Sequence, residues 1–256
     1  MIDARAVISP QAQLAADVEV GPFSVIGADV VIGAGCRIGS HVVINGPTRI
    51  GAHNRIHPFA SVGDAPQDKK YQGEPTRLEI GDRNVIRESV TINRGTVGGG
   101  GVTRIGNDNL LMAYSHVAHD CQLGSQIVLA NCATLGGHVE LGDWVIMGGL
   151  SAVHQFTKVG AHAFLAHNAM VTRDVPPYLM AVGRPALPHS VNSEGLKRRG
   201  FSSEQIQTIR RAFRLLYRSG LKLAEALAEL ERTAADHAEL VPFVEFIKAS
   251  TRSIVR

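Results

Sequence analysis

An aliphatic side chain returns every sixth residue along most of this sequence. Nine such positions in a row run from Leu14 to Val62, three more from Ile80 to Ile92, and twelve from Ile105 to Val171. The next residue is often glycine, and the residue four places on is small or β-branched, as at Ser24 and Cys36. A six-residue spacing held over nine positions fits neither an α-helix nor an ordinary strand, so it indicates an internal repeat.

The repeat predicts a triangular parallel β-helix. Each hexapeptide would form one flat side with its aliphatic residue pointing inward, while a glycine or asparagine allows the turn at the corner. Three hexapeptides make a coil of 18 residues, and successive coils stack about 4.8 Å apart. The aliphatic positions therefore predict roughly eight coils. The composition agrees with such a core, because 45% of the residues are hydrophobic and only 5% are aromatic.

Two segments leave the repeat, and the chain then changes character. Residues 64–79, "DAPQDKKYQGEPTRLE", and residues 94–104, "RGTVGGGGVTR", read as loops because of their polar, proline and glycine content. The prolines of "RDVPPY" end the repeat. We therefore expect a mainly β protein with a β-helix over residues 1–189 and an α-helical C-terminal domain over residues 190–256.

The C-terminal domain has the pattern of three helices. The first opens with "SSEQ", which offers Ser202 or Ser203 as N-cap, and closes at Gly220. The stretch "LAEALAELERTAADHAEL" predicts a second amphipathic helix, and a third is expected after Pro242.

Composition limits the setting and the partners. No apolar run approaches ~18 residues, so we expect no membrane span. The N-terminus lacks a signal-peptide pattern, and Cys36, Cys121 and Cys132 lack metal-ligand spacing, so we expect a cytoplasmic protein. The net charge is +3, and residues 185–256 hold 12 basic against 8 acidic residues. A mildly basic tail on a neutral body favours a local anionic ligand over nucleic acid.

Histidines are concentrated where the coil spacing brings residues together. The stretch "AYSHVAHDCQLG", residues 113–124, contains two of them, and positions 137 and 155 lie one and two coils further on. We expect these residues along one edge of the prism, within about 10 Å, pointing outward. The group comprises His116, His119, Gly137, His138, His154 and Gln155. An ordinary solvated surface has no need of four histidines, so this edge is the candidate functional site.

A metal site is the alternative for histidines on such a helix. His162 and His167 have a five-residue step, but Gln126 or Asn131 stands where a third ligand would be expected. We find no second ligand in a tetrahedral relation to His119, so we expect no metal. His162 is read as a surface residue whose replacement by alanine should be almost silent.

Five motifs in order carry a resemblance over essentially the whole chain. They are "QDKKYQGEPTR", "HVAHDC", "TLGGHVELGD", "AVHQF" and "NSEGLKRRGF". Together they resemble the acyl-carrier-protein-dependent UDP-N-acetylglucosamine O-acyltransferases, whose hexapeptide coils wind left-handed. The resemblance implies a homotrimer with active sites between neighbouring β-helices. It also implies transfer of an (R)-3-hydroxyacyl group from acyl carrier protein to the 3-hydroxyl of UDP-N-acetylglucosamine, the first step of lipid A biosynthesis.

The resemblance also assigns roles to single residues. It implies His119 as the general base, Asp120 as a group that orients it, and the backbone N–H of Gly137 as the donor to the oxyanion. Adjacent side chains on a strand usually diverge, so the role of Asp120 stays open. The donor would be the phosphopantetheine thioester of acyl carrier protein, with no separate cofactor.

Substrate contacts follow from the same motifs. The sugar nucleotide and the donor would be held by Asp68, Lys70, His116, His138, His154 and Gln155. The uridine diphosphate would be reached by Asn192, Glu194, Arg198 and Arg199, since adjacent arginines suit a pyrophosphate. His167 falls where the resembling enzymes place the floor of the acyl groove. An imidazole there implies a preference for chains of roughly ten to twelve carbons.

One residue departs from the family pattern, and other functions remain to be separated. Many relatives would carry a histidine at Asn93, which lies outside the candidate edge. The nearest alternatives are the related N-acyltransferase and a coenzyme A-dependent sugar-nucleotide acyltransferase. A non-catalytic β-helix such as an ice-binding protein would present rows of threonine on one side, and none is present.

Overall fold

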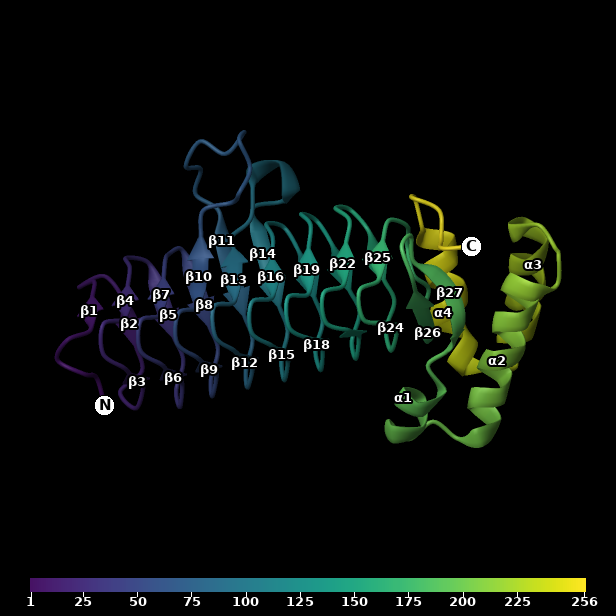
Figure 1. The fold of residues 1–256 in the computed structure, drawn as a ribbon, viewed down its shortest axis with the longest axis horizontal. Helices are drawn as coiled ribbons and strands as arrows, with labels where there is room; N and C mark the ends of the chain where they lie inside the picture. Colours follow the sequence, from purple (N-terminus) through teal and green to yellow (C-terminus); the bar gives the residue numbers. More distant parts are fainter.

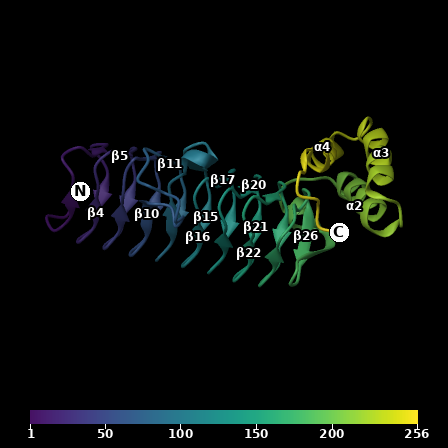
Figure 2. The ribbon, with the colours of Figure 1, turned by 90° about the horizontal axis from the view of Figure 1, so that it is seen from above.

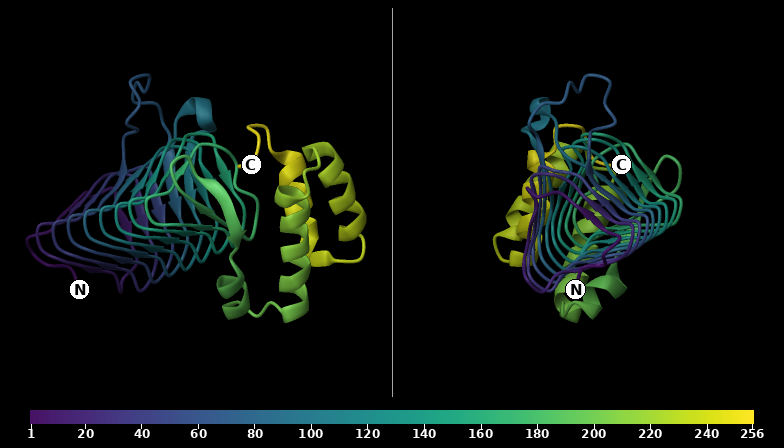
Figure 3. Two further views of the ribbon diagram at one scale, coloured as in Figure 1. Left: turned by 45° about the vertical axis from the view of Figure 1, so that its right-hand side comes forward. Right: turned by 90° about the vertical axis from the view of Figure 1, so that its left-hand side faces the viewer.

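Three parallel sheets form the sides of a triangular prism, and a helical region follows at one end (Figures 1 and 3). The computed structural model describes all of residues 1–256. The chain passes from sheet to sheet and pairs each strand with the strand one coil away. We call the sheets the first, second and third faces in chain order. The corner that follows each face is the first, second or third edge.

The first face has nine strands. They are β1 (Val7–Ile8), β4 (Val25–Ile26), β7 (Val43–Ile44), β10 (Ser61–Asp64), β13 (Thr91–Asn93), β16 (His116–Val117), β19 (Thr134–Leu135), β22 (Ala152–Val153) and β25 (Met170–Val171).

The second face has eight strands. They are β2 (Gln13–Leu14), β5 (Val30–Ile32), β8 (Thr48–Ile50), β11 (Arg77–Ile80), β14 (Val102–Ile105), β17 (Gln122–Leu123), β20 (Glu140–Leu141) and β23 (Lys158–Val159).

The third face has ten strands, and its last two form the only antiparallel pair. They are β3 (Glu19–Val20), β6 (Arg37–Ile38), β9 (Arg55–Ile56), β12 (Val85–Ile86), β15 (Leu110–Leu111), β18 (Val128–Leu129), β21 (Ile146–Met147), β24 (Phe164–Leu165), β26 (Leu179–Val182) and β27 (Leu187–Val191).

The predicted inward positions form the core. Val117, Leu135 and Val153, each one coil apart, are at most 2% exposed. Parallel register joins His116 to Thr134 and Thr134 to Ala152, which confirms the 18-residue coil. Every aliphatic position of the repeat is buried except Leu14, which is partly exposed near the N-terminal end of the prism.

The corners differ from the prediction. At most corners, the residue three places after the inward position has a positive φ, and it is rarely glycine; His138, Trp144 and Phe156 are examples. The conformation costs an L-residue about 1–2 kcal/mol, but the N–H at the corner donates to the coil below, as from His138 to His119 O at 3.0 Å. The repeat glycines allow successive coils to stack closely, because a Cβ on Gly142 would lie only 2.6 Å from the backbone nitrogen of Ala161 in the next coil.

Both loops leave the prism at the first edge (Figure 1). The loop between β10 and β11 covers residues 65–76, and the loop between β13 and β14 covers residues 94–101 with the short helix η1 (Val97–Gly99). The last three residues of each predicted loop therefore belong to strands. Register across the loops is 30 residues from Ser61 to Thr91 and 25 from Thr91 to His116.

A ladder of buried asparagines lies inside the second edge, beside these longer coils. The Asn54 side-chain oxygen accepts from the Asn84 backbone at 2.9 Å, and the Asn84 oxygen accepts from the Asn109 backbone at 2.9 Å. The Asn109 oxygen accepts in turn from Ile127 N at 2.7 Å. These amides hold the coils in register where the spacing departs from 18 residues.

The C-terminal region consists of short helices beside the last coils (Figures 1 and 2). They are α1 (Ser193–Arg198), α2 (Ser203–Arg218), α3 (Leu223–Ala234), η2 (Ala238–Leu240) and α4 (Val241–Ala249). Ser202 is the N-cap of α2, and its hydroxyl and the Gln205 side chain form a capping box. The last strand ends at Val191, two residues beyond the expected boundary. None of these helices is long and apolar enough to cross a bilayer.

The helical region packs on the second edge through a column of aromatic rings. His162 stacks between Trp144 and Tyr178, with ring centroids 6.3 and 5.8 Å apart, and Phe201 meets the His162 ring edge-on. The Asn192 amide also donates to His162 O at 2.9 Å. The interpretation of His162 as a surface residue is therefore wrong, because its ring is packed between the prism and the helical region.

His162 should make folding stability sensitive to acid. Burial is the largest cause of its lowered pKa, about 4 against the usual 6.5, and the Arg199 charge lowers it further. Between these pH values the unfolded chain binds a proton that the native chain does not, so stability falls on acidification through that window. We expect His162→Phe, which keeps a ring in the column, to lose less stability than the wild type between about pH 7 and pH 5. Urea unfolding at both pH values measures this. His53→Asn, at an exposed corner, is the control, and an unchanged pH dependence in His162→Phe would contradict the assignment.

Candidate active site

His119 and Asp120 form a hydrogen-bonded pair on the first edge. They follow β16, and Asp120 takes the corner position with φ 61°. This conformation removes the usual divergence of neighbouring strand side chains, and His119 Nδ1 lies 2.8 Å from Asp120 Oδ2. The Asp120 side chain is fully buried, whereas the His119 side chain keeps 15% of its exposure. The orientation that the sequence left open is present in the structure.

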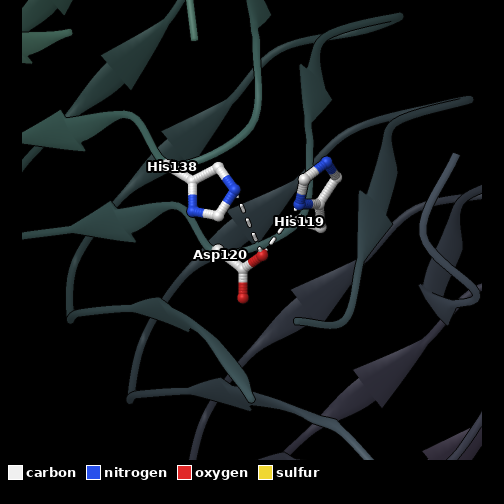
Figure 4. A group of neighbouring side chains, drawn as sticks. All are labelled: His119, Asp120 and His138. Carbon is white, nitrogen blue, oxygen red and sulfur yellow. Dashed lines mark hydrogen bonds and ion pairs between the residues drawn. The ribbon is translucent and has the colours of Figure 1, made fainter. Parts of the chain in front are cut away.

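The coil above provides Gly137 and His138. The His119 ring packs directly on Gly137, since a Cβ there would lie 2.7 Å from His119 Nε2. The Gly137 N–H has no acceptor within the chain. His138 Nε2 lies 3.7 Å from Asp120 Oδ2 (Figure 4), and its ring stacks on Phe156 at 4.2 Å. Burial lowers the pKa of His138, so the group above the pair is a neutral imidazole near pH 7.

The loop of residues 94–101 closes over the Asp120 carboxylate. Thr96 donates its backbone N–H to Oδ1 at 2.8 Å and its hydroxyl to Oδ2 at 2.6 Å. Burial by itself would raise the pKa of Asp120, but the hydrogen bonds from His119 and Thr96 outweigh it and lower the pKa. The carboxylate is therefore ionised although no solvent reaches it.

The remaining predicted residues of this edge lie around the pair. His116 is on β16, on the first face and not on the edge, so the single-edge prediction is wrong for this residue. Its Nδ1 lies 2.7 Å from the Thr91 hydroxyl, and burial lowers its pKa. His154 and Gln155 are exposed two coils above His119, and His154 Nδ1 lies 3.1 Å from Gln155 O.

The longer loop at the first edge carries Asp68 and Lys70. Asp68 is near enough to His138 for its charge to raise the pKa of that histidine, against the larger effect of burial. The Asp68 carboxylate also accepts from the Lys70 backbone at 3.0 Å, and the Lys70 side chain is exposed.

His167 lies elsewhere in the chain. It follows β24 on the third edge. Its ring lies beside Gly149, one coil below, since a Cβ on Gly149 would lie 3.5 Å from His167 Nδ1. The first and third edges are the two borders of the first face. His167 and His119 are thus separated by the width of that face and by more than two coils.

The predicted nucleotide-binding residues lie on the second edge. Arg199 lies over the Trp144 ring at 5.1 Å and contacts His162 Nδ1 at 3.3 Å, and burial lowers its pKa. Glu194 and Arg198 are exposed on α1. Asn192 is 6% exposed, and its amide caps α1 and binds His162 O, so its side chain positions α1. Within one chain the second face separates all four from His119.

The pair also has the donor atoms of a metal site. His119, Asp120 and His138 place three ligand atoms within 4.8 Å of one another. Two further ligand-type side chains therefore lie close to His119, which the sequence analysis did not predict. However, the carboxylate oxygen nearest both rings already accepts from Thr96 and His119 at hydrogen-bond distance. Hydrogen bonding accounts for the arrangement, so we interpret it as an acid–base pair.

Sequence reasoning missed two threonines of this site. Thr96 binds the Asp120 carboxylate, and the Thr103 hydroxyl accepts from Asp120 N at 2.7 Å. Thr96 belongs to a loop outside the repeat, so the 18-residue coil spacing does not place it beside Asp120. Thr103 lies on β14, which pairs with β17 at a spacing of 18 residues, so the coil register extended back from Ile105 places it beside Asp120. The only sign of the Thr96 contact in the sequence is the run of glycines around it. Glycines allow the backbone to approach another residue closely, but they do not show which residue it is.

Family models match both parts of the chain. The hexapeptide model of bacterial transferases matches residues 11–46, 29–64 and 102–137. The model described as UDP-N-acetylglucosamine O-acyltransferase, domain 2, matches residues 174–255.

Relatives that match the chain over its full length indicate the same family. The chain is 61% identical over its whole length to the acyl-[acyl-carrier-protein]–UDP-N-acetylglucosamine O-acyltransferase of Janthinobacterium, 99% of which is covered. It is 59% identical over 98% of its length to the enzyme of the same name from Thiobacillus denitrificans, of which 97% is covered. The solved structure of the Francisella novicida UDP-N-acetylglucosamine acyltransferase is 44% identical, with a TM-score of 0.98 over 100% of this chain and 94% of that one. Its sequence, its fold and both of its segments therefore make this chain a member of the acyl-[acyl-carrier-protein]–UDP-N-acetylglucosamine O-acyltransferase family.

Proposed function

We propose that this acyltransferase moves an (R)-3-hydroxyacyl group from acyl carrier protein to the 3-hydroxyl of UDP-N-acetylglucosamine, the first step of lipid A biosynthesis. The observation that carries the proposal is the His119–Asp120 pair packed against Gly137. Membership of the family favours O-acylation over the N-acyl and coenzyme A-dependent alternatives, because the two relatives are both named for O-acylation with acyl carrier protein.

The pair has the arrangement of a general base. An ionised carboxylate only accepts hydrogen bonds, so Asp120 fixes the proton of His119 on Nδ1 and leaves Nε2 as the acceptor. Nε2 would remove the proton from the sugar hydroxyl as its oxygen attacks the thioester carbon. When the tetrahedral intermediate collapses, His119 returns the proton to the departing thiol of phosphopantetheine. The neutral imidazole of His138 leaves the imidazolium without a second positive neighbour.

Gly137 has the properties of an oxyanion donor. Its N–H has no acceptor within the chain, and it lies on the coil directly above His119. The absence of a side chain lets a substrate approach the main chain closely. The charge that develops on the thioester oxygen would therefore meet a fixed dipole in a partly dehydrated site.

The surface of the prism supports a trimer. Outward residues of the first face carry no charge except Asp64 at the end of β10, and those of the third face are apolar from β12 to β26. The third edge between them exposes Phe23, Phe59, Tyr114 and Leu150 by 51–66%. The second face instead carries ion-paired charges, such as Arg104 with Glu79. A three-fold arrangement with the third edges at the axis would bury the apolar zone and leave the second face in water.

Such a trimer would also complete the active site. Contact between the first face of one chain and the third face of the next places the first edge beside the neighbour's second edge. His119 would then lie opposite Glu194, Arg198 and Arg199 of the partner, which it does not meet within its own chain. In Figure 3, viewed along the prism, the loops of the first edge and α1 lie on opposite sides. The two halves of the proposed site therefore belong to different chains.

His119→Ala should lower kcat by at least about 100-fold, the scale of a lost general base. The trimer should remain folded, because both hydrogen bonds from Thr96 to the buried Asp120 carboxylate remain. Product formation from UDP-N-acetylglucosamine and 3-hydroxyacyl carrier protein, followed by mass, measures this. His53→Asn at an exposed corner serves as the matched control and should keep full activity. Near-normal turnover in His119→Ala would exclude this role.

The shared site predicts complementation between two defective variants. Arg198→Ala/Arg199→Ala should raise KM for the nucleotide more than it lowers kcat, because a pyrophosphate does not react. Mixed trimers of this variant with His119→Ala should regain activity at about a quarter of all sites after random assortment, since one of three sites in each mixed ring is intact. Refolding the two variants together and separately measures the gain. No recovery in sedimenting mixed trimers, or a fully active monomer, would contradict the shared site.

His167 should set the acyl chain length. It is exposed at the inner border of the first face, where a chain that begins at His119 and crosses the face would end. Each methylene left unburied costs about 0.8 kcal/mol, so losing two to four gives roughly 10- to 200-fold discrimination. We expect a preference for donors of roughly ten to twelve carbons, with His167→Gly shifting the optimum to longer chains. Comparing kcat/KM for ten-, twelve- and fourteen-carbon donors tests this. The same chain-length profile in both proteins would show that His167 does not limit the length of the acyl chain.

A further inference from the structure

The loop of residues 94–101 contacts the acid–base pair through its buried member. Thr96 supplies two of the hydrogen bonds to the Asp120 carboxylate, at 2.8 and 2.6 Å, and His119 supplies a third at 2.8 Å. Thr103, just after the loop, accepts from the Asp120 backbone at 2.7 Å. Thr96 in the loop and Thr103 just after it are thus both hydrogen-bonded to Asp120, which lies 24 and 17 positions further along the chain.

The glycines of the loop make this contact possible. A Cβ on Gly99 would lie 2.0 Å from Asp120 Cγ, and one on Gly95 would lie 2.8 Å from Asp120 Oδ1. A Cβ on Gly98 would meet nothing within 4 Å. The backbone of Gly95 and Gly99 therefore covers the carboxylate and excludes water, whereas Gly98 has no such task.

We propose that Thr96 is a positioning residue for catalysis, and that the glycine loop holds Asp120 in the one orientation that fixes the His119 imidazole. The proposal rests on the proposed function, because it assigns Thr96 to the same acyl transfer. Thr96 contacts neither reacting atom; it acts through Asp120. Its hydroxyl shares Oδ2 with His119 Nδ1, so it sets both where the carboxylate points and how strongly it attracts the histidine proton.

Removing the hydroxyl should change catalysis in a characteristic way. A hydrogen bond to a charged group contributes enough for Thr96→Val to lower kcat roughly 10- to 100-fold, with KM for the sugar nucleotide within about twofold. Without this donor the carboxylate attracts protons more strongly, so the acid limb of kcat/KM should move to higher pH. The other groups that face the pair are His138, His116 and Asp68, and the substitution leaves them in place. Thr96→Ser restores the donor and should recover most of the activity at the original pH profile.

A double-mutant cycle with Asp120→Ala separates positioning from general loop damage. If Thr96 acts through Asp120, adding Thr96→Val to Asp120→Ala should change kcat by less than about twofold. Equal fold losses in both backgrounds, or a Thr96→Val enzyme with wild-type kcat and pH profile, would overturn the proposal. A wild-type chain that makes no product would instead overturn the proposed function.

Substitutions at the loop glycines test the same proposal independently. They decide it if Thr96→Val fails to assemble, as judged by sedimentation and thermal unfolding. Gly99→Ala forces the loop away from Asp120 and should reproduce the lower kcat and the shifted acid limb. Gly98→Ala, one residue earlier and with open space for its methyl group, should retain wild-type kinetics. Equal kinetics in the two alanine variants would overturn the proposal as well.

Discussion

Parallel pairing between successive coils is the constraint on which the rest of the molecule depends. Each strand bonds to strands one coil away, so residues 18 apart in sequence become neighbours in space. The core arises from this pairing, because one aliphatic residue per side stacks on its equivalents. The active site arises from it too, since Gly137 lies over His119 only because coil follows coil without slippage. A polar site can therefore be built on the outside of a scaffold whose inside is uniform.

A buried negative charge is the second requirement, and the structure meets it locally. Asp120 is removed from solvent yet ionised, which is stable only when donors replace the lost water. His119 and two groups of Thr96 provide those donors. The carboxylate is thereby held rigidly, whereas the histidine that it orients is partly exposed to solvent. Burial and orientation are two results of the same hydrogen bonds.

The repeat made the fold predictable, whereas contacts made outside the repeat were not. Spacing alone predicted the coils, the inward residues and the proximity of His119 to Gly137, because each depends only on period. It misjudged the corners, where stacking and coil-to-coil hydrogen bonds let residues such as His138 adopt positive φ in place of glycine. It misplaced His162, whose surroundings come from the C-terminal helices, and it missed Thr96, whose loop has no period. The exposed apolar zone around Leu150 was not predicted, because its residues come from different coils and meet only in the folded prism.

The asparagine ladder inside the second edge has a consequence for how such a chain can diversify. Its amides join coils of 30 and 25 residues as well as coils of 18, and they do so on the edge away from both insertions. The alignment of the scaffold is therefore independent of how much polypeptide is inserted at the first edge. The loop of residues 65–76, which does not hold the Asp120 carboxylate, is free to lengthen, shorten or change composition between lineages while the coils above and below stay in register. Evolution can thus alter substrate selection at one corner of the prism without redesigning its interior.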